Sequence, residues 1–110
     1  MSMKVETPNP DTIVYHVSGS FDALAVKEHR LEMEALLDDA PSLHVFDFSG
    51  TNFMDSSGIG AVVFMYKQLK TRQKRVAITG LIGQPLDLIE MLRVGKVIDI
   101  YPTISDVPSD

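Results

Sequence analysis

The residues of this chain that could do chemistry gather in one short segment, F-M-D-S-S-G-I-G at residues 53–60. Two adjacent hydroxyl groups, those of Ser56 and Ser57, lie there between an apolar run that predicts a strand and a segment with helical periodicity. Backbone N–H groups in the first turn of a helix have no intrahelical partner, and the helix dipole makes that end electropositive. A phosphate on a serine at this point would be stabilised, and it would change the charge of a surface loop. The segment therefore predicts a phosphorylation switch, with simple helix capping by a serine as the structural alternative.

Catalytic and metal chemistry finds little support elsewhere in the chain. The nucleophile-elbow pattern G-x-S-x-G is absent because Met54 stands where its first glycine should be, and no histidine follows Ser56 to act as a base. The three histidines have no ligand-like spacing, and the chain has no cysteine, which excludes thiolate catalysis and cysteine-bound zinc. No glycine-rich phosphate-binding motif follows a predicted strand. We expect no catalytic residue, no metal, no cofactor and no enzymatic activity.

Composition limits the class of protein and of partner. The chain has 110 residues, enough for one domain with a single core, and 45% of them are apolar. Its formal net charge of −5 argues against nucleic acid as a partner, since phosphate binding needs a basic patch. No stretch resembles a signal peptide or a membrane span. We therefore expect a soluble cytoplasmic protein that contacts neither nucleic acid nor membrane.

Strand and helix patterns alternate along the chain. Strands are expected at residues 4–7, 13–17, 43–48, 75–79 and 97–101, with turns at 8–11 and 49–52. The nearly apolar run 43–48 predicts a strand that is covered on both faces. Helices are expected from the N-cap Asp22 to about Asp38, from about Ser57 onward, and from Gln84-Pro85 to a C-terminal cap at Gly95. Right-handed crossovers would give an α/β fold, a small mixed and largely parallel sheet with helices packed on it.

Two expectations concern side chains on these elements. In the first helix the apolar positions form two stripes, Leu24/Leu31/Ala35 and Val26/Met33/Leu37. This is more than one buried face needs, so one stripe is expected to be partly exposed. The methionines Met54, Met65 and Met91 are expected in the core.

Three segments of the chain resemble the STAS domain, the fold shared by anti-sigma factor antagonists and the cytoplasmic tails of sulfate transporters. They are V-S-G-S-F-D at 17–22, V-F-D-F-S at 45–49 and the segment 53–60, and the resemblance runs from about Val5 to Tyr101. It implies a single STAS domain over residues 1–110. The antagonist branch carries D-S-x-G-[LI]-G at the third segment, and its first serine accepts phosphate. By this match the acceptor is Ser56.

The family resemblance implies a mechanism called partner switching. The unphosphorylated antagonist binds a serine kinase of the histidine-kinase-like ATPase fold, which doubles as an anti-sigma factor, and so frees the sigma factor. Phosphorylation of the antagonist ends this binding, and a PPM-type serine phosphatase restores it. The residues expected to bind the partner surround the acceptor: Asp22, Asp55, Ser57, Gly58, Ile59 and Gly60.

One departure and two alternatives accompany the resemblance. The family often has an acidic residue at the position of Ser20. The docking surface near Asp22 is therefore expected to suit a kinase different from the well-known kinases of this family. The output could also be something other than a sigma factor, such as control of biofilm or secretion. The chain could instead be the STAS domain of a sulfate-type anion transporter, although Ser56 and the initial methionine favour a stand-alone regulator.

Overall fold

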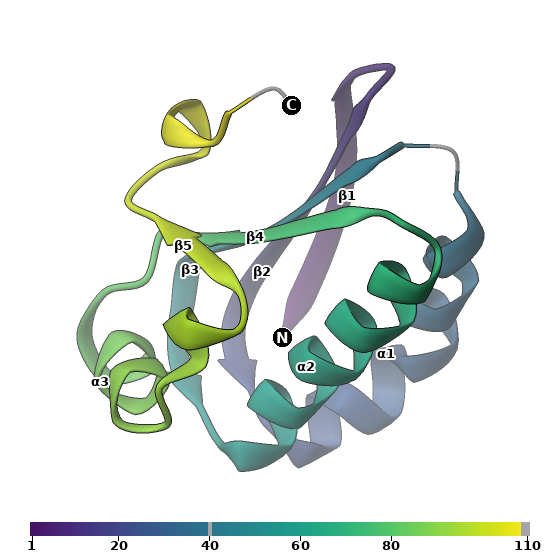
Figure 1. Ribbon diagram of the computed structural model, residues 1–110. Helices are drawn as coiled ribbons and strands as arrows, with labels where there is room; N and C mark the ends of the chain where they lie inside the picture. The colour runs from purple at the N-terminus through teal and green to yellow at the C-terminus, as the bar shows by residue number, and fades with distance from the viewer. Residues whose placement is uncertain (40, 109–110) are drawn as a thin grey trace.

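Strands and helices alternate through most of the chain in the computed structural model, which describes residues 1–39 and 41–108 (Figure 1). The order is β1 (Ser2–Asn9), β2 (Thr12–Phe21), α1 (Ala23–Ala35), η1 (Leu36–Asp38), β3 (Leu43–Met54), α2 (Ser56–Thr71), β4 (Arg75–Thr79), α3 (Gly83–Met91), η2 (Val94–Lys96), β5 (Asp99–Tyr101) and η3 (Ile104–Asp106), where η marks a short 3₁₀ helix.

The sheet follows chain order, β1-β2-β3-β4-β5. Strands β1 and β2 form an antiparallel hairpin, and every later neighbour pairs in parallel. Each crossover advances by one strand in the same direction, and right-handed crossovers of this kind place their helices on the same face. Helices α1, α2 and α3 all contribute to one core cluster with the same strand face, which confirms the predicted mixed, largely parallel α/β sheet.

The core lies between this helical layer and the sheet. Tyr15 and Phe46 stack with ring centroids 4.5 Å apart, and Phe48 continues the aromatic row. The opposite face of the sheet has a smaller apolar cluster, which the C-terminal segment covers through Tyr101, Ile104 and Val107. All residues of the run 43–48 are buried, so the prediction of a strand covered on both faces is confirmed.

Two predicted strand ends are wrong. Residues 18–20 and 49–52 have turn-like composition, yet β2 and β3 continue through them. The two stretches pair with each other, as in Ser18↔Gly50 and Gly19↔Thr51, with local register shifts. The Thr51 hydroxyl also donates to the carbonyl of Val17 at 2.7 Å. A parallel partner thus satisfies backbone groups that would otherwise favour a turn.

The carboxyl end of α3 differs from the prediction as well. The helix ends at a C-cap on Leu92, and Arg93 takes the left-handed conformation with φ of 56°, so Gly95 is not the cap. Met54 and Met65 are buried as expected, whereas Met91 is 70% exposed because the helix ends there and faces outward. In α1 the stripe containing Leu24 and Leu31 is exposed, which confirms the predicted partial exposure.

Candidate functional site

Helices α1 and α2 begin next to each other at the carboxyl edge of the parallel strands. Phe21 ends β2, Met54 ends β3, and the two residues are paired across the sheet. Each strand is followed at once by an aspartate and a helix, so Asp22 and Asp55 occupy equivalent positions. Ser56 is the first residue of α2 and is exposed. The topology therefore brings the predicted phosphate acceptor and both predicted acidic neighbours to one edge.

Asp55 holds the two helix starts together. Its Oδ1 atom accepts a hydrogen bond from the backbone N–H of Gly58 at 3.0 Å, which makes Asp55 the N-cap of α2. Its Oδ2 atom accepts from the N–H of Ala23, the first residue of α1, at 3.2 Å. The alternative that a serine caps α2 is therefore wrong. A carboxylate suits this position because its two oxygens can accept from both helices at once, whereas a hydroxyl offers a single oxygen.

Asp22 caps its own helix, as the sequence predicts. Its Oδ1 atom accepts from the N–H of Ala25 at 3.0 Å. The backbones of Asp22 and Asp55 match closely, with φ of −119° at both residues. Ser56 therefore begins one of two neighbouring helices that are both capped by an aspartate.

The glycines of the segment 53–60 have different environments. A Cβ atom on Gly58 would lie 2.3 Å from the carbonyl oxygen of Phe21, so only glycine lets α2 start this close to the end of β2. Ile59 is buried in the core. Gly60 is exposed, and a Cβ atom there would meet nothing within 4 Å. Gly58 and Ile59 are therefore buried and position the helix, whereas Ser56, Ser57 and Gly60 are exposed at the surface.

Gln84, expected from its local sequence only to open the third helix, also positions the end of β3. Its side-chain amide donates to the carbonyl of Met54 and accepts from the N–H of Met54, both at 2.8 Å. Strand β4 ends at Thr79, so the end of β3 has no strand partner on that side. The amide of Gln84 takes the place of a peptide group there and fixes the residue two positions before Ser56.

Large apolar side chains are exposed at the same edge. Leu24 lies in the first turn of α1, Phe53 near the end of β3, and Ile82 at the N-cap of α3. All three elements start or end at the carboxyl edge of the parallel strands. An exposed hydroxyl at the same edge as exposed apolar side chains and two carboxylates is suited to protein contact.

The histidines lie away from Ser56. His44 is buried near the start of β3, where Nδ1 accepts from the Tyr15 hydroxyl at 2.7 Å and Nε2 donates to the Pro41 carbonyl at 3.1 Å. Burial, assisted by the charge of Lys74, lowers the pKa of His44 to about 4. Burial also raises the pKa of the Tyr15 hydroxyl. His29 contacts Glu32 within α1, and His16 lies on the sheet face opposite the helices, so none of the three is placed to activate Ser56.

Within the described ranges, no group of three His, Cys, Asp or Glu side chains could hold a metal ion. None of the helices in those ranges combines the length and the apolar character that crossing a bilayer needs.

Comparisons with known proteins agree with the fold. The family model for the STAS domain matches residues 3–107. The anti-sigma-B factor antagonist of Listeria monocytogenes is 25% identical over 100 residues, covering 91% of this chain and 88% of that protein.

Several solved structures share the fold. An anti-sigma factor antagonist from Mycobacterium paratuberculosis superposes with a TM-score of 0.86 at 23% identity, over 96% of this chain and 88% of that one. The phosphorylated form of the Bacillus cell fate determinant SpoIIAA gives 0.73 at 21% identity, over 96% and 95%. A sulfate transporter family protein from Wolinella succinogenes gives 0.76 at 10% identity, over 91% and 84%. These likenesses show the fold, which antagonists and transporters share.

Proposed function

The chain belongs to the STAS domain family, and from this premise we propose that it is a phosphorylation-controlled binding protein of the anti-sigma factor antagonist kind. The unphosphorylated chain binds a serine kinase of the histidine-kinase-like ATPase fold that doubles as an anti-sigma factor. Phosphorylation of Ser56 ends this binding, and a PPM-type phosphatase reverses it. The protein acts in the cytoplasm, regulates transcription through its partner, and catalyses no reaction itself.

The observation that carries the proposal is the setting of the Ser56 side chain. Ser56 is the first residue of α2 and is exposed, while the carboxylate of the preceding Asp55 accepts hydrogen bonds from the N–H groups of Gly58 and Ala23. A kinase can reach this hydroxyl without unfolding any element. The names of the relatives add support, since one is an anti-sigma-B factor antagonist and another was solved in a phosphorylated form.

The charge of a phosphate gives the switch its physical basis. Phosphorylation adds about −1.5 to −2 charges at neutral pH, next to the carboxylates of Asp22 and Asp55. In the free protein this charge faces water and the electropositive end of α2, so the fold tolerates it. In a complex the phosphate must lose its water beside these two carboxylates and the exposed apolar side chains at the same edge. Reversing a binding equilibrium from 99:1 to 1:99 takes about 5.5 kcal/mol, and an unpaired buried charge costs that order of energy.

Two neighbouring functions share this geometry. A partner-switching regulator whose output is not a sigma factor would use the same Ser56 surface, and only its partner would differ. A STAS domain from an anion transporter would share the fold, but its function would not require phosphate on Ser56. The Ser56 surface therefore favours the regulator over the transporter.

The experiment compares wild type, Ser56→Ala, Ser56→Asp and the matched control Ser57→Ala. Each is incubated with ATP and an ATPase-fold serine kinase from the same organism, and phosphate is located by mass spectrometry. We expect phosphate on wild type and Ser57→Ala but not on Ser56→Ala. Calorimetry should show tight binding by Ser56→Ala and affinity about tenfold lower for Ser56→Asp, about 1.4 kcal/mol. Phosphate on Ser56→Ala would refute the assignment of the acceptor, and equal affinities of Ser56→Ala and Ser56→Asp would refute the charge mechanism.

A further inference from the structure

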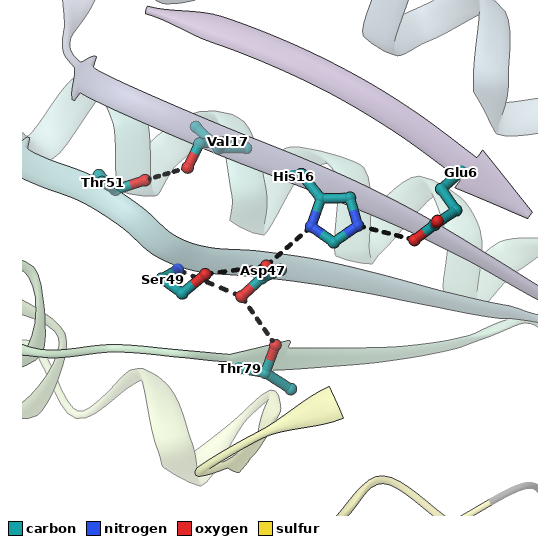
Figure 2. A network of polar contacts seen from close by, with 7 residues as sticks. All are labelled: Glu6, His16, Val17, Asp47, Ser49, Thr51 and Thr79. Atoms are coloured by element: carbon teal, nitrogen blue, oxygen red, sulfur yellow. Dashed lines mark hydrogen bonds and ion pairs between the residues drawn. The ribbon is translucent and has the colours of Figure 1, made fainter. Parts of the chain in front are cut away.

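The sheet face opposite the helices holds a polar network across the four neighbouring strands β1 to β4 (Figure 2). His16 of β2 lies at its centre, between Glu6 of β1 and Asp47 of β3. Its Nε2 atom is 2.9 Å from Oε1 of Glu6, and its Nδ1 atom is 2.8 Å from Oδ2 of Asp47. One imidazole ring therefore links the edge strand β1 to the interior strand β3.

Both ring nitrogens of His16 face carboxylate oxygens, and this fixes the charge that the ring must carry. An ionised carboxylate only accepts hydrogen bonds, and a neutral imidazole has a single N–H to donate. Both contacts can be made only by the imidazolium form. The hydrogen bond with Glu6, aided by Asp47 and opposed by partial burial, raises the pKa of His16 above its ordinary value.

The two contacts would not survive proton loss equally. Asp47 is only 7% exposed, and it also accepts from the backbone and the hydroxyl of Ser49 at 3.2 and 3.0 Å and from the Thr79 hydroxyl at 3.5 Å. Glu6 is exposed and its carboxylate can be solvated at little cost. A neutral His16 would therefore keep its N–H on Asp47 and turn a lone pair toward Glu6, which then leaves.

Glu6 lies directly before an irregularity in the pairing of β1 with β2. The pairing of β1 with β2 is regular from Ser2↔Ser18 to Glu6↔Val14 and then shifts register before Asn9↔Thr12. The contact between Glu6 and His16 thus fastens the last regular pair before this irregularity. Loss of the contact would loosen the turn end of the hairpin first, since the regular pairing of β1 with β2 ends there.

We propose that protonated His16 is a pH-sensitive clasp that fastens the edge strand β1 to the sheet through Glu6, and that loss of its proton releases β1 at the turn end. The charged groups that face the ring are Glu6 and Asp47, together with Lys4, which lies directly opposite His16 on β1. From β4 the network receives only the neutral hydroxyl of Thr79. The proposal is independent of the function of Ser56.

The test is an NMR titration of the histidine rings in wild type, Glu6→Gln and the matched control Lys4→Gln. We expect His16 to titrate above the ordinary histidine range, Glu6→Gln to lower its pKa, and Lys4→Gln not to lower it. Buried His44 should titrate below the ordinary histidine range, with a pKa shifted in the opposite direction from that of His16, and it serves as an internal reference. A His16 that titrates at or below the ordinary value, or that is unaffected by Glu6→Gln, would overturn the proposal.

Amide exchange provides the structural readout. Solvent exchange of the β1 amides is measured on both sides of the His16 titration and normalised to unstructured-peptide rates at each pH. We expect about two- to fivefold faster normalised exchange near Glu6 after deprotonation, because partly exposed ion pairs are weak, and no such step in His16→Gln. Equal normalised exchange in wild type across the titration, or the same step in His16→Gln, would contradict the clasp.

Discussion

Replacement of Gly58 by alanine tests how closely α2 must approach β2. The added Cβ atom would lie 2.3 Å from the Phe21 carbonyl oxygen, and such contacts are essentially never found below 3.0 Å, so the helix start must retreat by at least 0.7 Å (3.0 − 2.3). That movement strains the hydrogen bond from the Asp55 N–H to the same oxygen and the contact between Asp55 and Ala23. Overpacking costs about 1–3 kcal/mol and a weakened hydrogen bond about 1 kcal/mol, while alanine in place of glycine returns about 1 kcal/mol of helix propensity. We expect a net loss of about 2 kcal/mol in the free energy of unfolding.

Gly60→Ala is the matched control, two residues later in the same helix. A Cβ atom there meets nothing within 4 Å, so only the propensity gain remains and stability should rise by about 0.5–1 kcal/mol. Urea denaturation of both variants and wild type measures the difference, which should be about 3 kcal/mol. If Gly58→Ala were as stable as Gly60→Ala, the close approach of α2 to β2 would be wrong, and with it the account of how Ser56 is positioned.

Two further predictions concern residues that act on the core and on the site. Because the pKa of His44 is about 4 in the folded chain and about 6.5 when unfolded, the unfolded state binds the proton more readily below pH 6.5. As the pH falls from 6.5 to 4, the free energy of unfolding should therefore fall by about 3 kcal/mol at most. Denaturation of His44→Gln measured over the same pH range should lack this part of the loss. If the acid profile of His44→Gln were the same as that of wild type, His44 would be excluded as the source of the loss. Gln84→Ala removes both hydrogen bonds to the Met54 backbone. It should lower the free energy of unfolding by about 1–2 kcal/mol and speed amide exchange at residues 53–56. Exchange as slow as in wild type would show that Gln84 does not fix this segment.

Local chemistry was enough to predict much of the fold. The alternation of apolar runs and helical patterns predicted the α/β class and the parallel sheet, because the pattern of residues decides which elements form and right-handed crossovers decide how they connect. The apolar run 43–48 predicted its burial on both faces. Asp22 was recognised as an N-cap because that signal depends on only a few neighbouring residues.

Several features could not be predicted because their partners are distant in sequence. Residues 49–52 look like a turn, but pairing with residues 18–20 makes them part of β3. The true cap of α2 is Asp55, and nothing local indicates that its second oxygen binds Ala23 of another helix. Gln84 contacts Met54 only because β4 ends early and leaves that position free. Met91 is of a residue type common in cores, but its position at the end of α3 exposes its side chain to solvent.

The amino-acid sequence by itself determined the class of fold, the family and the segment that holds the proposed phosphate acceptor, because propensity, periodicity and a short motif are properties of neighbouring residues. The tertiary structure decided that Asp55 joins the start of α2 at Ser56 to the start of α1, that Gly58 admits no side chain, and that His16 meets a carboxylate on each side. These arrangements depend on which strands become neighbours, since a contact across the sheet joins residues that lie about 10 to 30 positions apart along the chain.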